Sequence, residues 1–557
     1  MTSLRLDLRF AARALARRPG FAVTVTLALA LGVGANTALV SLADALLFRG
    51  LPYPQAERLV RLFPLDVKGK ETNAVSYPEV VALARASRTL DRVVPFSSSS
   101  DVDLALSGHP PARAHAALVG GEYFPLLGVR AAHGRMLGGA DDRAGAPAVA
   151  VLAEPFWRRT FGADPAVVGR IARVNRQAVE VIGVVPLGFL GVSLDDAPDL
   201  WLPMAQVSAV LPHFAAVRPL EATNFGWVDT LARLAPGATP AAARAEVELV
   251  RRELGRGWGK KLAPRMSVLP AREALIAAST RPLALRTAWL LFGAGALVLS
   301  LAGLVAGVLM LLRGELRHRE LAVRRSIGAS SSDLLRVVAS EAFLLGLAGA
   351  AAGVLLARAW QQVLVALLPP DFPLLPAAVS DALGARLLAI ASAAGLLVAL
   401  VAGAIPLWRE RRRDPVSSLE GERPMEVAGW RLPLRSALIV LQVGLSVVIL
   451  SAAGLLLRTL WKASRVDAGI STQGVVLASI NLSRQGYDKE RGERFWQDLL
   501  ADLAARPGVD AVALARHVPV DDSGMYTTMV PEGYRAAPDE MVGTTFNVVS
   551  PDYFRAL

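Results

Sequence analysis

The segment Phe21–Ala43, FAVTVTLALALGVGANTALVSLA, decides how the rest of the chain is interpreted. It contains no Asp, Glu, Lys or Arg, and about 20 apolar residues in a helix are enough to cross the hydrocarbon core of a bilayer. Five arginines precede it, as in a signal peptide, but the apolar run of a signal peptide is only about 7–15 residues long. We therefore interpret 21–48 as the first transmembrane span, preceded by a basic segment at 1–20.

Four more segments have the same character. Thr287–Leu312, Leu387–Trp408 and Ser436–Leu457 contain no charged residue, and Val337–Leu356 contains only Glu341. A charge near the end of a span can extend its side chain to the interface, so the last segment also qualifies. The pattern predicts an α-helical transmembrane bundle with five spans in this chain, a four-span unit followed by the first span of a second unit.

Short arginine-rich loops set the orientation of these spans. Arginines crowd the segment 1–20, the loop 313–336 and the residues directly after span four, whereas Pro369–Arg386 has two Asp and one Arg. Because short cytoplasmic loops carry the excess of Lys and Arg, we expect a multi-pass protein of the bacterial inner membrane with a cytoplasmic N-terminus. Residues 49–282 and everything after about Arg458 then lie in the periplasm.

The net charge of +12 has the same origin. The basic residues crowd beside apolar segments, whereas a nucleic-acid surface would show a basic stripe with interleaved aromatic residues. We therefore expect the lipid bilayer, and no nucleic acid, as a partner. The chain has no cysteine, which excludes disulfides and thiolate metal sites.

The first outer region has the pattern of a mixed α/β domain. Short alternating apolar runs predict strands, and Pro236-Gly237 breaks the chain before a helix that Thr239 could cap. We expect strands at Arg58–Leu65, Asp91–Phe96, Ile171–Val174, Val179–Val185 and Val228–Leu234, and helices at Tyr77–Ala86 and over 239–254.

The second outer region repeats this order. Val475–Leu482 and Val509–Ala515 are predicted strands on either side of a predicted helix at Asp488–Ala505. The run VGGEYFPLL at Val119–Leu127 also matches VSPDYFRAL at Val549–Leu557, at an offset similar to that between spans one and five. We expect an internal duplication, which is common in transport proteins. The chain ends inside the repeated unit, which indicates a truncated second copy; a degenerate copy that ends naturally is the alternative.

Several runs, taken together and in order, resemble the MacB-like permeases that carry an FtsX domain. They include RRPGF at Arg17–Phe21, LALGVGANTA at Leu29–Ala38, LPYP at Leu51–Pro54, FGADP at Phe161–Pro165 and RELAVRRSIGAS at Arg319–Ser330. The duplicated orphan permeases described from acidobacteria are the most similar group, and they imply a longer chain. The resemblance implies a MacB-type periplasmic domain at 49–282, an FtsX-type domain with spans two to four at 283–408, a cytoplasmic linker at 409–435, a span at 436–457 and the start of a second periplasmic domain at 458–557.

The cytoplasmic loop 313–336 is the most informative polar segment. As a helix it would place its arginines on or beside one face, with a break at the glycine that follows. By the resemblance, this loop contacts a separate ABC ATPase subunit and couples it to the membrane. From the residues alone, an amphipathic helix on anionic lipid headgroups is equally consistent. The candidate coupling residues are Arg317, Arg319, Glu320, Arg324, Arg325, Gly328, Ala329 and Ser330.

No enzyme motif is present in the sequence. There is no G-x-x-x-x-G-K-[ST], H-E-x-x-H or G-x-S-x-G, so we expect no catalytic activity, cofactor or metal in this chain. A separate subunit, if any, would bind ATP. His318 and the acidic pairs Asp141-Asp142 and Asp195-Asp196 are interpreted as solvated loop residues.

Polar side chains within the spans are few. Asn36 and Thr37 in span one and Gln442 in span five are expected to hydrogen-bond across helices, and an uncharged bundle argues against a hydrophilic pathway through it. The small-residue pairs that allow close helix contact are Gly303 with Gly307 and Gly349 with Gly353.

Two functions fit these features. The first is an efflux or extrusion permease that acts with a separate ATPase, as a dimeric or pseudo-dimeric assembly and with a periplasmic or outer-membrane partner. The alternative is an FtsX-like regulatory membrane protein, which transmits force to a periplasmic partner and transports nothing. The similarity to orphan permeases leaves a third reading open, in which the chain works without an ATPase. The sequence does not identify a substrate.

Overall fold

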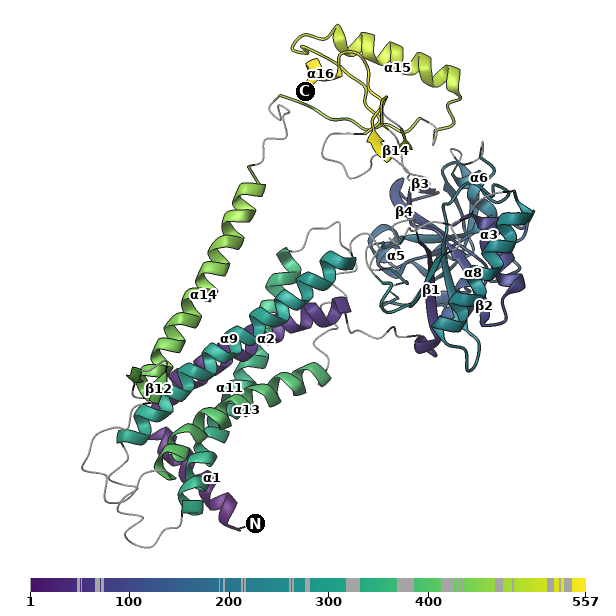
Figure 1. Cartoon of the computed structure of the whole chain (residues 1–557). Coiled ribbons are helices and arrows are strands. Elements are labelled where there is room, and N and C mark those ends of the chain that lie inside the picture. Colours follow the sequence, from purple (N-terminus) through teal and green to yellow (C-terminus); the bar gives the residue numbers. More distant parts are fainter. Residues whose placement is uncertain are drawn as a thin grey trace. The chain divides into compact units, whose positions relative to one another are not determined.

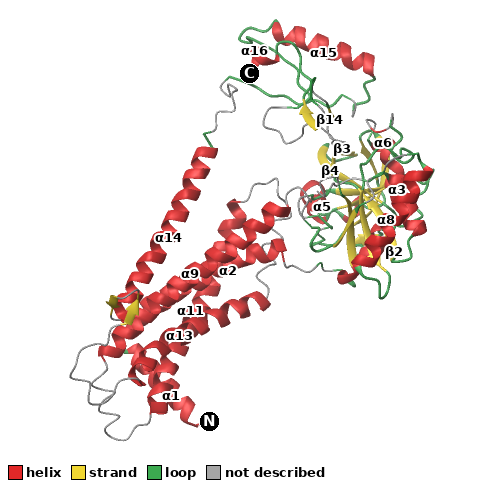
Figure 2. Ribbon diagram, in the orientation of Figure 1, coloured by secondary structure: helices red, strands yellow, loops and turns green. Residues whose placement is uncertain are grey.

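The structure, a computed structural model, describes residues 2–47, 51, 53–65, 71, 75–189, 191–193, 196–211, 214, 217–259, 262, 265–275, 281–316, 331–367, 385–411, 425–427, 430–432, 434–465, 474–482, 485–517, 525–529, 532–534 and 543–557. They fall into two compact units (Figures 1 and 2). The first is helical and comprises Met1–Arg49 and Arg281–Ser464. The second contains the large sheet and comprises Gly50–Thr280 and Arg465–Leu557.

Long apolar helices build the first unit (Figure 1). They are α2 (Pro19–Leu47), α9 (Arg281–Leu316), α11 (Ser331–Leu367), α13 (Ala385–Arg411) and α14 (Leu434–Ala463), with the shorter α1 (Thr2–Ala16) and a hairpin of β12 (Met425–Val427) and β13 (Trp430–Leu432). By length and composition, the helices at Pro19–Ser41, Arg281–Gly314, Arg336–Val363 and Ser436–Ala463 could each cross a membrane. Four of the five predicted spans therefore have the expected form. The remaining predicted span, Leu387–Trp408, lies in α13, where the apolar stretch found among the described residues is shorter, Leu388–Gly403.

The centre of this unit is α2, which contacts α9, α11 and α13. Val25 and Leu29 of α2 are buried together with small and apolar residues of these three helices. Glycines bring the helices close: a Cβ on Gly349 would lie 2.6 Å from Leu29 Cβ, and one on Gly353 would lie 2.8 Å from Val33 Cβ. Between helices in a membrane, such packing supplies the attraction that the hydrophobic effect supplies in water. The close contact predicted at Gly349 and Gly353 is confirmed.

Two polar residues of α2 have different surroundings. Thr37 Oγ1 donates a hydrogen bond to the carbonyl oxygen of Val33, 2.6 Å away in the same helix, so the predicted bond across helices is wrong for Thr37. The carbonyl one turn back is always within reach of a helical threonine and satisfies its hydroxyl locally. Asn36 does face a neighbouring helix, because a Cβ on Gly295 of α9 would lie 2.5 Å from Asn36 Oδ1. The cross-helix bond predicted for Gln442 stays a prediction.

The close approach at Gly353 can be tested by substitution. Gly353→Leu is expected to destabilise the helical unit by about 1–3 kcal/mol, because the new side chain would collide with Val33 of α2. The midpoint of thermal unfolding of the detergent-purified chain measures this effect. The matched control is Gly454→Leu in α14, where a Cβ would meet nothing within 4 Å. Equal loss of stability in both variants would contradict the assigned contact.

The second unit is organised around an 11-stranded sheet with the order β11-β1-β10-β2-β4-β3-β7-β8-β6-β9 and β5 beside β8. An additional pairing of β4 with β9 joins the two ends of the run from β4 to β9 into a closed ring, which removes free strand edges. The strands are β1 (Leu59–Pro64), β2 (Leu90–Phe96), β3 (Ser100–Leu106), β4 (Ala112–Val119), β5 (His133–Gly134), β6 (Val149–Leu152), β7 (Ile171–Val174), β8 (Gln177–Val184), β9 (Leu200–Pro203), β10 (Asp229–Leu234) and β11 (Met266–Pro270).

Strands β1, β2, β10 and β11 form a ferredoxin-like layer with two helices, α3 (Tyr77–Ala86) and α8 (Pro240–Gly257) (Figure 2). Its chain order is β1, α3, β2, β10, α8, β11 and its sheet order is β11-β1-β10-β2. Val60 of β1 packs in one core with α3 and α8, whereas its neighbour Leu59 packs in the core of the ring. Strand β1 is therefore buried on both faces.

Local sequence patterns predicted the positions of several of these elements correctly. The predicted helix at Tyr77–Ala86 is α3, and the strands predicted at Ile171–Val174 and Val179–Val185 form the hairpin β7–β8, with Asn175 and Arg176 at positive φ in its turn. Such turns match the right-handed twist of the strands. Thr239 caps α8 as predicted, since its Oγ1 accepts a hydrogen bond from the Ala242 N–H at 3.2 Å.

The second outer segment keeps only part of this pattern. The predicted helix is α15 (Lys489–Ala504), capped by Asp488, but Val475–Leu482 and Val509–Ala515 do not form strands, so these two predictions are wrong. A strand needs an extended partner. Among the described residues of these two runs, only Ala515 makes a β-bridge, to Val549.

The predicted internal match nevertheless extends to the backbone. Ala515 pairs with Val549 as Phe96 pairs with Val119, and in each case a Tyr-Phe pair follows and begins a short helix. These helices are α4 (Tyr123–Leu127) and α16 (Tyr553–Ala556), and the two rings of each pair meet edge to face at 5.3 and 5.2 Å. The shared register supports the predicted duplication.

Candidate functional site

The predicted coupling residues, together with His318, fall in 317–330, outside the described residues. This segment connects the end of α9 at Leu316 to the start of α11 at Ser331. The structure does describe the helices on both sides of it. Arg313, three residues before the end of α9, meets Glu341, which lies ten residues after the start of α11. We call this pair, Arg313 and Glu341, the loop-base ion pair.

The loop-base ion pair is buried and contacts two further helices. Nη2 of Arg313 lies 3.3 Å from Oε2 of Glu341, and the two side chains are 7% and 8% exposed. The same Nη2 donates to the carbonyl oxygen of Ala14 in α1 at 3.4 Å. The guanidinium also lies over the ring of Phe21 in α2, 4.5 Å from its centre. One arginine thus connects α1, α2, α9 and α11 beside the predicted coupling loop.

Because the ion pair is buried, its two side chains resist separation. Moving a charge from water into a protein interior costs several kcal/mol, and the cost is repaid only while the partner stays in place. A displacement that separated Arg313 from Glu341 would remove the close ion pair between two buried charges. The pair therefore resists relative movement of α9 and α11 next to the loop. The sequence placed Glu341 near a span end, but no local spacing indicated its partner.

The basic segment 1–20 contains a helix that its charge alone does not predict. Ala11 of α1 is 1% exposed and Leu15 packs against the core of the helical unit, while Arg9 and Arg13 are exposed. The spacing of Leu8, Ala11 and Leu15 among arginines is the amphipathic signal that could have identified α1.

In the second unit, Arg61 of β1 is the centre of a buried network. Its Nη2 lies 2.9 Å from Oδ1 of Asp229, the first residue of β10, and its Nη1 donates to the carbonyl oxygen of Ala274 at 2.7 Å. The guanidinium lies over the rings of Phe63 and Phe96, 4.9 and 5.0 Å from their centres. Arg61 thus holds β1, β10 and the segment after β11 together.

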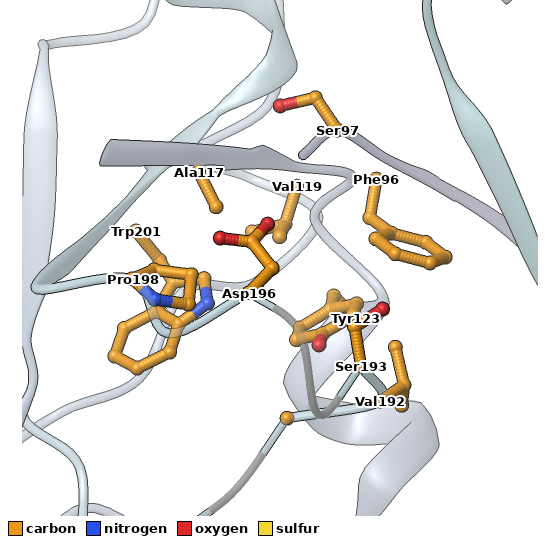
Figure 3. Close-up of a pocket in the computed structure, with 11 residues that line it drawn as sticks. Phe96, Ser97, Ala117, Val119, Tyr123, Val192, Ser193, Asp196, Pro198 and Trp201 are labelled. Carbon is orange, nitrogen blue, oxygen red and sulfur yellow. The ribbon is translucent and has the colours of Figure 1, made fainter. Parts of the chain in front are cut away.

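A small pocket opens beside this network (Figure 3). Asp196 lines it and accepts hydrogen bonds from the N–H of Ser99, at 2.7 Å, and from the Ser99 hydroxyl. Tyr123 lies at its base, where burial raises the pKa of the phenol. The cavity volume is about 20 Å³, enough for a water molecule, whereas ligand pockets have roughly 300–1,000 Å³. This pocket is too small for a substrate in the conformation described. Asp195 lies outside the described residues.

The pair Asp141-Asp142 is not solvated, so that interpretation is wrong. Asp141 is 9% exposed and pairs with Arg135 at 2.7 Å, and this hydrogen bond holds its pKa below the usual range. Asp142 accepts hydrogen bonds from the N–H groups of Gly121 and Ala205 at 3.0 and 2.8 Å, while burial raises its pKa. The sequence shows the two acidic residues, but it does not show which backbone N–H groups donate hydrogen bonds to them. No group of three or more His, Asp or Glu among the described residues is placed to hold a metal ion.

Comparisons with known proteins agree with this architecture. Residues 22–250 match the family model of the MacB-like periplasmic core domain, and residues 292–415 match that of the FtsX-like permease C-terminal. The chain belongs to the MacB-like permeases with an FtsX domain. The match to the MacB-like periplasmic core domain includes most of α2 and most of the α/β segment between α2 and α9.

Relatives of this permease include two named exporters. The pyoverdine export ATP-binding/permease protein PvdT of Pseudomonas syringae pv. tomato is 27% identical over 313 residues, and the macrolide export ATP-binding/permease protein MacB 1 of Aeromonas hydrophila is 28% identical over 305 residues. Each match covers 55% of this chain but only 43% of the relative. Among solved structures, the periplasmic region of MacB from Actinobacillus actinomycetemcomitans is 17% identical, with a TM-score of 0.30, over 39% of this chain and 90% of that one.

The loop-base ion pair is testable by removing one or both charges. Glu341→Gln is expected to destabilise the permease by about 3–5 kcal/mol, because Arg313 is left buried without its counter-charge. The double variant Arg313→Met/Glu341→Leu is expected to lose less than the single one. Chemical unfolding of the detergent-purified chain measures both, with the exposed Arg458→Met as control. A Glu341→Gln variant as stable as the wild type would contradict the buried pairing.

Proposed function

We propose that this permease is the transmembrane subunit of a MacB-like ABC-type transport system. In this proposal, a separate ATPase drives motion that the helices transmit to the periplasmic domain for export or extrusion of substrates. The chain is a multi-pass protein of the bacterial inner membrane with a cytoplasmic N-terminus and five spans, of which α13 is the fourth. It acts in a dimeric or pseudo-dimeric assembly.

The observation that carries this proposal is the way the helices connect to the sheet. Helix α2 leads into β1, and β11 leads into α9. Strands β1 and β11 are antiparallel neighbours, with Val60 opposite Pro270. Helices α2 and α9 are also in close contact, where Gly32 meets Ala302. Two helices that pack on one another therefore continue into two strands that pair with one another, and a relative shift of the helices would reach two adjacent strands.

Helix α9 suits the transmission of such a shift. It is continuous over 36 residues, roughly 54 Å, from the residues after β11 to the start of the coupling loop. At the loop end, the loop-base ion pair fixes it to α11. On the sheet side, Arg61 holds β1 to β10 and to Ala274, at the start of the connection from β11 to α9. The helix thus begins in the chain after the segment that Arg61 holds and ends beside the loop-base ion pair.

We assign the ATPase contact to the loop 317–330, with Arg324 and Arg325 as its central basic residues. The support is that its two flanking helices are joined by a buried pair at the loop base, so that a force on the loop is borne by that pair. Export is supported by the names of the relatives, although each match covers 43% of the relative. The named compounds, pyoverdine and macrolides, are not carried over to this chain.

One observation favours the FtsX-like regulatory function as a second candidate. The pocket lined by Tyr123 and Asp196, among the described residues of the periplasmic domain, has a cavity volume of only about 20 Å³ and offers no space for a substrate. Both candidates use the same transmission path. They differ in whether vesicles that contain the permease and its ATPase move a solute.

Charge reversal in the loop tests the coupling assignment. Arg324→Glu/Arg325→Glu is expected to reduce the ATPase activity that co-purifies with the tagged permease by at least about tenfold, because two attractive contacts become repulsive. The control Arg458→Glu/Lys462→Glu makes the same charge change at the end of α14 and should keep the activity. Unchanged ATPase association in the loop variant would contradict the assignment, provided that its unfolding temperature matches that of the wild type.

A further inference from the structure

Helix α1 has one face in the protein and one face outside it. Ala11 and Leu15 are packed in the helical unit, whereas Arg9 and Arg13 are exposed on the opposite side, and Arg17, directly after the helix, is also exposed. Successive residues advance by 100° around a helix, which places Arg9 and Arg13, four residues apart, on one stripe that Arg17 follows in the chain. Among the described residues, none of these three side chains makes an ion pair. The function proposed above leaves this stripe unexplained.

An aromatic side chain borders the stripe. Phe10 is 59% exposed, and the guanidinium of Arg13 lies over its ring, 5.5 Å from the centre. An exposed phenylalanine beside arginines costs free energy in water but suits the boundary between headgroups and acyl chains. The packed face of α1 is already occupied by the protein, so the Phe10 side of the helix is free to meet the membrane.

The chain keeps α1 close to the membrane surface. Only Arg17 and Arg18 separate its last residue, Ala16, from Pro19, the first residue of the spanning helix α2. The carbonyl oxygen of Ala14 is also bonded to Arg313, which lies against Phe21 in the first turn of α2. Two connections, one covalent and one through Arg313, thus hold α1 beside the end of the spans.

We propose that the exposed face of α1 binds acidic phospholipid at the membrane surface, with Arg9, Arg13 and Arg17 on the headgroup phosphates and Phe10 at the acyl boundary. Arginine presents a planar fork of donors to a phosphate, and each basic residue near an anionic surface contributes about a fivefold gain in affinity. Because Arg313 bonds to the backbone of the same helix, the lipid-bound α1 braces the loop-base ion pair. The proposal rests on membrane insertion of α2 and does not require an ATPase.

The absence of cysteine from the chain makes a direct measurement straightforward. A spin label on Phe10→Cys, in the full-length protein reconstituted in vesicles, reports depth through the ratio of its accessibility to oxygen and to a water-soluble nickel chelate. Vesicles of pure phosphatidylcholine are compared with vesicles that contain about one third phosphatidylglycerol. We expect the label to lie at the acyl boundary in the acidic vesicles and to become several-fold more accessible to nickel in the neutral ones. High salt should shift it in the same direction.

Two variants separate a lipid site from a general surface effect. Arg9→Gln/Arg13→Gln/Arg17→Gln, in the labelled background, should remove most of the dependence on phosphatidylglycerol. Arg458→Gln/Lys462→Gln, which removes charges from the end of α14, should leave it intact. A label that is equally accessible to nickel in both vesicle types would overturn the proposal. So would a dependence on phosphatidylglycerol that survives the triple substitution. Neither outcome would bear on the ATPase contact, which is assayed separately.

Discussion

The close contact of α2 with its neighbours is the constraint on which the helical unit depends. Apolar side chains gain nothing from the hydrophobic effect when lipid surrounds them, so the helices must associate through contact area. Gly349 and Gly353 of α11, and Gly395 of α13, supply it by letting Leu29 and Val33 of α2 come within van der Waals contact of their backbones. Because α2 touches α9, α11 and α13 together, a shift of this one helix changes three interfaces.

Each of the two units contains a buried ion pair that joins several of its helices or strands. The loop-base ion pair closes the helical unit beside the predicted coupling loop, and Arg61 closes the sheet where β1, β10 and β11 come together. Both arginines are buried, and both lie over aromatic rings while they pair with a carboxylate. A buried charge tolerates little displacement from its partner. Each pair therefore resists separation of the elements that it joins within its own unit.

The sequence predicted the parts of this architecture that depend on local pattern. Uncharged runs predicted the spans, Thr239 predicted the start of α8, and short alternating apolar runs predicted β7 and β8. The sequence could not predict contacts between distant residues. Examples are the ion-pair partner of Glu341 and the backbone N–H group that donates a hydrogen bond to Asp142. Strand predictions failed at Val475–Leu482 because a strand depends on a partner that its own residues do not encode. For the candidate site, the sequence supplied the loop and one acidic residue, and the structure supplied the arginine that completes the buried pair.

The chain combines a MacB-like periplasmic core domain with an FtsX-like permease domain. A domain inserted between two packed helices is attached to them by neighbouring strands. In the proposed function, movement of the helices is passed to the domain through these two connections.

The proposed transmission of motion requires that the loop 317–330 and the α/β domain lie on opposite sides of one membrane. Single cysteines at Ser326→Cys and at the exposed Ser107→Cys, in the cysteine-free chain, can be labelled in intact cells with a maleimide that crosses the outer but not the inner membrane. The account predicts that position 107 is labelled directly and position 326 only after the inner membrane is permeabilised. Labelling of both positions in intact cells, or of neither, would contradict it.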